Sequence, residues 1–329
     1  MQILRLELPV LRRLNPGVLT TPISFVVIFL AFAIFSQGHR FIDPRNLGAI
    51  AKLTPDLGVV ALGVGILMIA GEFDLSVASV LALCSFIFTQ FLLAGVNPFL
   101  ALVLVLAIGD ALGLLNGVLV VRTGLPSFVI TLSTMMFWRG ILFVVSGQMP
   151  ISILSYVPPN SPLGRVLTGE IGQVPVQILW FLAFALILGA VLHLGSFGNW
   201  VYAIGSNQDA ARAMGIRVPL VKVACYMIVG TLCAFSSVMQ AVRLGSFAAT
   251  QGTGFELRSI AAVVVGGTAL QGGVGNMVGM ALGVFIIQAI DNGLILMQVP
   301  VFGIDTFIGI AVILFVILNN LTNRQFAGR

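Results

Sequence analysis

Five ionisable side chains lie within or beside the long apolar runs of this sequence and are its candidates for chemistry. Asp110 and Arg139 lie inside such runs. Glu72 and Asp74 lie where two runs meet, and Asp291 lies near the end of another. A charged group inside a membrane is costly unless it is paired or hydrated, so such groups mark ion or solute paths. Each could also pair with a neighbour or cap a helix, and the sequence leaves both roles open.

The two acids in 71-GEFDLSVAS-79 differ in how easily a structural role explains them. Asp74 suits the start of a helix, where its carboxylate would accept a hydrogen bond from the backbone near Val77. Glu72 lies only two residues away, and two ionised carboxylates in an apolar setting repel each other. Glu72 is therefore harder to explain by capping alone.

Nucleotide hydrolysis within this chain is excluded by its lysines. A phosphate-binding loop needs a Lys that reaches the nucleotide, and Lys52 and Lys222, the only lysines, follow no glycine-rich loop. The sequence also lacks the G-x-S-x-G and H-E-x-x-H motifs of hydrolases and zinc proteases. With only His39 and His193 and no Cys/His cluster, we expect no metal site, no cofactor and no catalytic residue.

The elements that must position these residues are membrane helices. Hydrophobic residues make up 59% of the 329 positions and charged residues only 8%, against about 25% charged in soluble domains. No soluble fold of this length could bury so much apolar surface. The apolar runs are continuous rather than alternating, which favours helices over a β-barrel. We therefore expect an all-α integral membrane protein forming one transmembrane domain over residues 1–329.

A membrane span needs about 20 mostly apolar residues, and about ten stretches qualify. An even number places both termini on one side. The arginines before the first stretch and after the last favour the cytoplasm for that side. The net charge of +5 then reflects cytoplasmic loops and not nucleic-acid binding. The expected spans are 21–37, 53–71, 75–96, 98–121, 126–146, 174–194, 218–242, 259–273, 275–292 and 303–320.

Glycines mark two unusual features of the expected bundle. The charge-free stretch 259–290 is short for two spans and long for one, and its glycines indicate broken or re-entrant helices. Glycine at every fourth position opens a smooth face on which another helix can pack closely. We expect two such faces to pack inside one bundle, with a subunit interface as the second possibility. They are Gly109, Gly113 and Gly117, and Gly275, Gly279 and Gly283.

The longest polar loop, 146–173, should lie outside the cell, where it would either meet an external partner or serve as a plain connector. Its prolines limit helix formation. On the opposite side, 202-YAIGSNQDAARAMGIRV-218 interrupts the apolar runs. Asn207 suits the N-cap of a two-turn helix, and Gly215 suits its left-handed end. Such a cytoplasmic helix would either fit the groove of a partner or lie in the lipid headgroups.

Four blocks resemble permease subunits of bacterial ABC sugar importers of the ribose/xylose/galactose type. YAIGSNQDAARAMGIRV resembles Y-A-I-G-G-N-x-x-A-A-R-x-x-G-I, and GEFDLSVASVLAL resembles G-G-I-D-L-S-V-G-S-x-x-A-L. 126-PSFVITLSTMMFWRG-140 resembles P-x-F-I-x-T-L-x-x-M-x-x-x-R-G. 259-SIAAVVVGGTALQGGVGNMVGM-280 resembles A-I-A-A-V-V-I-G-G-T-x-x-x-G-G-x-G. The blocks follow one another in the family's order.

The resemblance implies a permease of the bacterial inner membrane that works by alternating access. Its partners would be a cytoplasmic ATPase subunit, which holds ATP and Mg²⁺, a periplasmic or lipoprotein substrate-binding protein, and a second permease copy or related chain. A coupling loop, 195–217, would dock on the ATPase. The residues that match the family's coupling loop are Gly205, Asn207, Ala210, Ala211, Arg212, Gly215 and Ile216.

Two departures from the family pattern leave the imported solute open. Glu72 and Ala78 stand where the family usually has Gly. The family also includes members for autoinducer-2 and nucleosides. A different class, an ion-coupled carrier using carboxylates such as Asp110 and Asp291, is the alternative, because intramembrane carboxylates on broken helices serve such carriers.

Overall fold

A computed structural model describes residues 16–327 and consists mainly of helices. Arg5, Arg12, Arg13 and Arg329, which carry part of the argument for cytoplasmic termini, lie outside the described residues. The long helices are α1 (Pro16–Phe35), α2 (Pro44–Ile69), α3 (Val77–Leu93), α4 (Pro98–Thr123), α5 (Ser127–Ser146), α7 (Val176–Leu194), α10 (Val218–Leu244), α12 (Met277–Leu296) and α13 (Val301–Ala327). The short ones are η2 (Gln37–Ile42), α6 (Pro162–Thr168), α8 (Ser196–Ser206), α9 (Gln208–Ala213) and α11 (Phe255–Val265).

Among residues 16–327, six helices are long and apolar enough to cross a membrane: α2, α4, α5, α7, α10 and α12. Shorter apolar helical stretches cover 21–35, 77–93 and 303–315. This confirms the all-α membrane class, whereas about ten spans and the side of the termini stay predictions. At about 1.5 Å per residue, the 11 residues of α11 extend about 16 Å, roughly half of the hydrocarbon layer.

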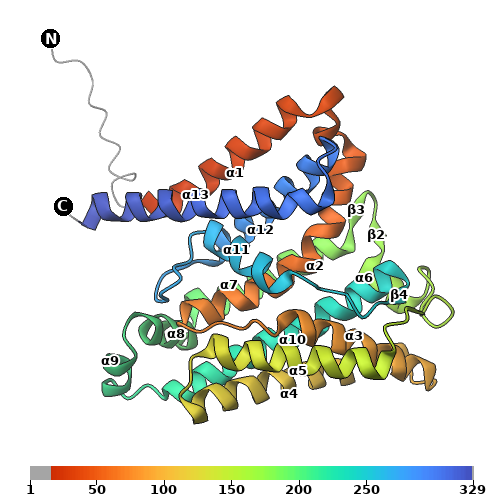
Figure 1. Ribbon diagram of the computed structural model, residues 1–329, viewed down its shortest axis with the longest axis horizontal. Coiled ribbons are helices and arrows are strands. Elements are labelled where there is room, and N and C mark those ends of the chain that lie inside the picture. The colour runs from red at the N-terminus through yellow and green to blue at the C-terminus, as the bar shows by residue number, and fades with distance from the viewer. Residues whose placement is uncertain (1–15, 328–329) are drawn as a thin grey trace.

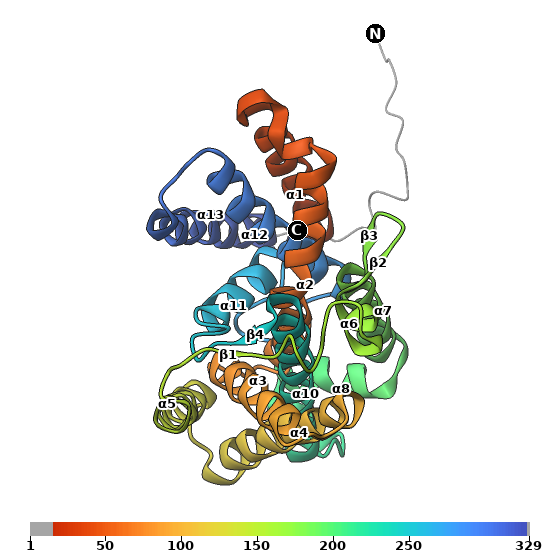
Figure 2. The same ribbon diagram turned by 90° about the vertical axis from the view of Figure 1, so that its right-hand side faces the viewer.

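The bundle is built around α2 and α10, which pack against each other. Helices α3, α4 and α5 lie on one side of this pair, and α1, α11, α12 and α13 lie on the other (Figures 1 and 2). Helix α7 packs along α2. The arrangement explains why α2 is almost wholly buried, whereas α4, α5 and α7 leave most of their surface exposed.

The stretch 259–290 contains the expected break. Helix α11 ends at Val265, and α12 begins only at Met277. Between them the chain turns through Gly267, Gly272 and Gly273, whose φ angles are +89°, +85° and +73°. Only glycine adopts such angles readily, so these residues allow the chain to reverse without helical structure. The prediction of a broken helix is confirmed.

The polar loop 146–173 is more ordered than its prolines suggest. Pro162 starts α6 instead of preventing it, because proline fits the first turn of a helix, and Ser161 Oγ accepts a hydrogen bond from Gly164 N at 3.1 Å. Strand β1 (Ile151–Ser152) pairs antiparallel with β4 (Ser246–Phe247). Strand β2 (Glu170–Ile171) pairs likewise with β3 (Val174–Pro175). The loop is therefore attached to the segment that follows α10.

Both glycine faces pack inside the chain. A Cβ on Gly113 would lie 2.3 Å from Tyr226 O, and one on Gly230 would lie 2.1 Å from Gly109 O. The second face repeats this on α12, where a Cβ on Gly283 would lie 2.0 Å from Ala262 O of α11. The preferred prediction, close helix contact within one bundle, is confirmed.

The α4–α10 contact gives a direct test. Gly113→Ala should lower the free energy of unfolding by about 1–3 kcal/mol, because the new methyl group overlaps a backbone oxygen. Gly140→Ala is the matched control, since a Cβ there meets nothing within 4 Å and alanine favours a helix by about 0.5–1 kcal/mol. Unfolding would be followed by tryptophan fluorescence in detergent. Equal stability of the two variants would contradict the packing argument.

Candidate site: a capped helix joined to an unwound membrane segment

Helix α9 is short and closed at both ends by its own sequence. Asn207 Oδ1 accepts a hydrogen bond from Ala210 N at 2.9 Å. At the other end Gly215 has φ +85°. Gly215 N donates to Arg212 O, and Ile216 N donates to Ala211 O, which is the Schellman arrangement. The predicted two-turn helix, its N-cap and its glycine end are all confirmed.

The exposed side of α9 carries small and apolar groups. Ala210 and Ala213 are exposed, and Met214 is 82% exposed. Arg212 forms an exposed ion pair with Asp209 at 3.1 Å. Ala211 is buried and Ile216 packs on the core, so α9 is fixed by one side and presents the other. The helix lies at the edge of the molecule (Figure 1).

Helix α8 attaches α9 to the bundle at the end where α2 terminates. A Cβ on Gly205 would lie 1.8 Å from Ile69 O and 2.5 Å from Gly273 N. Gly273 N also donates to Ile69 O at 2.8 Å. Tyr202 OH donates to Gly275 O at 2.7 Å, and partial burial raises the pKa of this phenol, which keeps its proton. Because Gly205 has no side chain, the backbone of α8 can contact the end of α2 and the turn 266–276.

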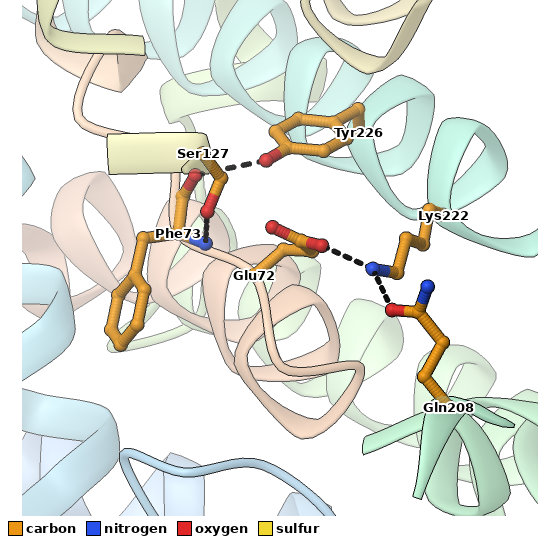
Figure 3. A network of polar contacts seen from close by, with 6 residues as sticks. All are labelled: Glu72, Phe73, Ser127, Gln208, Lys222 and Tyr226. Carbon is orange, nitrogen blue, oxygen red and sulfur yellow. Dashed lines mark hydrogen bonds and ion pairs between the residues drawn. The ribbon is translucent and has the colours of Figure 1, made fainter. Parts of the chain in front are cut away.

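The segment 71–76, between α2 and α3, is unwound, and side chains of other helices bind its backbone. Phe73 N donates to Ser127 Oγ of α5 at 3.1 Å, and Phe73 O accepts from Tyr226 OH of α10 at 3.0 Å. Leu75 N donates to Thr131 Oγ1 of α5 at 3.1 Å. Backbone N–H and C=O groups that are not paired within a helix need such partners when they are buried. The segment is therefore held by the helices around it (Figure 3).

Asp74 has a local structural role. Its Oδ1 accepts from Ser76 N at 2.8 Å and from Ser76 Oγ at 2.6 Å. Asn116 of α4 then donates to Ser76 Oγ at 2.7 Å. The N-cap of α3 is Ser76, so the prediction of Asp74 as the N-cap is wrong: Asp74 lies two residues earlier and binds the cap residue itself. Its carboxylate is buried and organises the turn into α3.

Glu72 pairs with Lys222, which lies near the start of the expected span 218–242. Lys222 Nζ, in the first turns of α10, donates to Glu72 Oε1 and also to Gln208 Oε1, the latter at 2.7 Å (Figure 3). The Lys222 and Glu72 side chains are only 12% and 11% exposed. Gln208 is the first residue of α9. One cation therefore joins the unwound segment to α9.

A family model described as the permease component of a branched-chain amino acid transport system matches residues 46–319. The chain belongs to this family. Residues 46–319 include the unwound segment, α9 and the broken stretch before α12. The permease is thus a multi-pass protein of the inner membrane, as its long apolar helices also indicate.

The permease is similar to curated relatives over nearly its whole length. The ribose import permease protein of Bacillus subtilis (strain 168) is 36% identical over 92% of this chain and 94% of its own length. The ribose import permease protein of Escherichia coli (strain K12) is 31% identical over 90% and 92%. The D-allose transport system permease protein of the same strain is 31% identical over 92% of each chain. No solved structure matches the permease.

The other predicted path residues lie apart from this site. Asp110 accepts from Thr231 Oγ1 of α10 at 3.2 Å. Arg139 donates to Ala249 O at 2.7 Å and holds the turn after β4. Asp291 pairs with Arg258 at 3.0 Å, and Arg258 also binds Asp305. Of the five path candidates, only Glu72 and Asp74 belong to the unwound segment 71–76.

Three polar side chains that form contacts between helices were not predicted as site residues: Lys222, Asn116 and Asp56. Asn116 gave no signal, because it is an ordinary polar residue until its partner is known. Lys222 lies near the start of the expected span 218–242, so the rule applied to Asp110 would have found it. The same rule would have found Asp56, which lies inside the expected span 53–71 and is buried. Its carboxylate pairs with Arg243 at the far end of α10.

Within residues 16–327 no group of three or more His, Cys, Asp or Glu side chains could hold a metal ion. The polar groups near α9 are instead paired with one another across the helices. Their arrangement suits the transmission of movement between helices.

Proposed function

We propose that this chain is the permease subunit of an ATP-driven importer for a monosaccharide or related small polar solute. The observation that carries the proposal is α9, a helix with both ends capped and one small, apolar side exposed. Such a helix fits a groove of a partner protein. Met214, Ala210 and Ala213 would enter a cleft of a cytoplasmic ATPase subunit, and Arg212 would lie at its rim.

The solute class rests on the relatives. The family description mentions branched-chain amino acids, whereas relatives that align with 92% of the chain are named for ribose and D-allose. A xylose/arabinose import permease of Sulfolobus acidocaldarius is 28% identical over 91% of the chain. These names favour a sugar. They also favour an ATP-driven system over an ion-coupled carrier.

The partners follow from this assignment. ATP and Mg²⁺ would be bound by the ATPase subunit, a separate binding protein would deliver the solute, and a second permease copy or a related chain would complete the path through the lipid. We assign no catalytic residue, cofactor or metal to this chain, and no nucleic-acid partner. We place about ten spans in a single domain, with both termini and the coupling loop 195–217 in the cytoplasm and the loop 146–173 outside.

The roles of individual residues divide into two groups. The coupling loop would use Asn207 and Gly215 to shape α9, and Ala211, Ile216 and Gly205 to seat it on the bundle. Among the five path candidates, Glu72 and Asp74 are favoured because they lie in the unwound segment. Asp110, Arg139 and Asp291 have structural partners elsewhere.

Deletion of the gene in its native host tests the function. Uptake of radiolabelled ribose, xylose, allose and leucine would be compared between the deletion strain and the strain complemented with the full chain. We expect uptake of one sugar to be lost on deletion, to stop when arsenate depletes ATP, and to persist when an ionophore collapses ion gradients. Uptake that follows the ion gradient would overturn the proposal. Loss of leucine uptake alone would show that the solute is a branched-chain amino acid, as in the family description, and not a sugar.

A further inference from the structure

Lys222 connects α9 to the unwound segment 71–76, so a displacement of α9 could be passed to the helix bundle through it. Its ammonium group contacts Gln208 on one side and Glu72 on the other (Figure 3). These three residues lie in α9, α10 and the unwound segment 71–76. We call them the ionic link.

The two ends of the ionic link differ in how they are held. Gln208 lies on the exposed helix α9, which meets the bundle mainly through Ala211 and Ile216. Glu72 belongs to a segment whose backbone binds Ser127, Thr131 and Tyr226. Moving Glu72 therefore strains contacts with α5 and α10. Through Ser76 and Asn116 the same segment also reaches α4.

The ionic link has space in which to rearrange. A cavity of about 350 Å³ lies beside it, lined by Glu72, Lys222, Gln208 and Arg212 on one side and by the α4–α5 turn, Gly124–Ser127, on another. A lysine side chain is long and flexible, and its ammonium has three donors that can exchange acceptors. A displacement of Gln208 can thus carry the Lys222 ammonium group with it, while the pair with Glu72 persists and passes the movement on.

We propose that the ionic link is a second coupling element, which transmits displacement of α9 to the unwound segment 71–76 and so to α4, α5 and α10. This inference rests on the proposed function, because it takes an ATPase subunit as the source of the displacement. It assigns Glu72, Lys222 and Gln208 as positioning residues for transport. Sequence reasoning gave Glu72 only a place on the solute path, and gave Lys222 and Gln208 no role.

An ionic link explains the departure at position 72. Glycine, the residue usual in the resembling family, could not pair with Lys222. In this chain the carboxylate at position 72 neutralises a mostly buried ammonium group, and a buried charge needs a partner. Glu72 and Lys222 therefore form a functional unit, and replacing one should have the same consequence for coupling as replacing the other.

The test measures solute imported per ATP hydrolysed. The full chain is purified with its ATPase subunit and reconstituted in proteoliposomes with the binding protein and the radiolabelled sugar that the deletion strain fails to take up. Glu72→Gln, Lys222→Met and Gln208→Ala should each lower this ratio about tenfold, within the range typical of coupling between sites. ATP hydrolysis should stay within about twofold of the wild type, because α9 keeps its caps and its exposed side.

Two comparisons separate coupling from stability. Lys52→Met and Glu170→Gln break another Lys–Glu pair, which is 43% and 49% exposed, and should leave the ratio unchanged. The double variant Glu72→Lys/Lys222→Glu should recover most of the ratio, because the amide of Gln208 can donate to a carboxylate as well as accept from an ammonium. Gln208→Ala leaves the Glu72–Lys222 pair intact, so its melting temperature should match that of the wild type.

The failures can be told apart. If the wild-type complex shows no ATP-driven uptake, the proposed function is wrong. If the wild type transports and all three single variants import as much sugar per ATP as Lys52→Met, the ionic link is not a coupling element. A lowered melting temperature with an unchanged ratio would likewise overturn the inference and leave a purely structural ion pair.

Discussion

Replacing Arg243 by Met should lower the free energy of unfolding by about 3–5 kcal/mol, the range measured when one partner of a buried ion pair is removed. Arg243 Nη2 binds Asp56 Oδ2, and the Asp56 side chain is only 6% exposed. The other side-chain donor to this carboxylate, Gln240 Nε2, lies at 3.4 Å. Without Arg243 the carboxylate would stay buried between α2 and α10 with little compensation.

The measurement is SDS titration in mixed micelles, followed by tryptophan fluorescence. The double variant Asp56→Leu/Arg243→Met should recover stability to within about 1 kcal/mol of the wild type, because replacing both charges by apolar groups is often neutral. Lys52→Met, which breaks an exposed pair, should cost less than about 1 kcal/mol. A double variant as unstable as Arg243→Met would show that the loss comes from packing and not from the unpaired charge.

The pairs Glu72–Lys222 and Asp56–Arg243 could not be predicted from the sequence. Glu72 and Lys222 are 150 positions apart, and Asp56 and Arg243 are 187 positions apart. Nothing local in the sequence specifies such partners, because they depend on how α2 and α10 pack. The general rule that a charge in an apolar run is either paired or functional was correct. Whether a given charge is paired depends on which helices pack against it, so only the structure could decide between these two roles.

Local features were much more predictable. The long apolar runs gave the helices of the bundle, and Asn207 and Gly215 gave both ends of α9, since capping depends only on neighbouring residues. The glycine faces on α4 and α12 also predicted close contacts correctly. In contrast, α6 was missed because Pro162 was taken as a helix breaker, although proline at the first position starts a helix.

The sequence therefore predicted two parts of the candidate site but not the contact that joins them. The sequence marked α9 and the unwound segment as separate features, one by composition and one by two acids near each other. The connection between them is Lys222, to which the sequence assigned no role. Without the connection, α9 is a docking helix and Glu72 is an unexplained acid. With it, the two become the ends of one path between the exposed side of α9 and helices α4, α5 and α10.

Gly215→Pro should abolish transport while leaving the bundle folded. Gly215 has φ +85°, whereas proline is fixed near −65° and cannot donate the hydrogen bond that Gly215 N makes to Arg212 O. The end of α9 would have to unwind, which would move Met214 and Arg212 away from the positions proposed to face the ATPase. We expect sugar uptake in cells to fall by about tenfold or more, with an unchanged melting temperature for the purified chain.

Gly215→Asn is the matched control. A Cβ at this position meets nothing within 4 Å, so the backbone angle is the only constraint, and asparagine tolerates left-handed angles better than other side chains. Uptake with Gly215→Asn should therefore stay close to that of the wild type. Because the open space removes any clash, equal losses in both variants would mean that the glycine itself contacts the partner. Normal uptake with Gly215→Pro would show that α9 does not carry the movement, and the coupling path would then have to enter the bundle through α8 and Gly205.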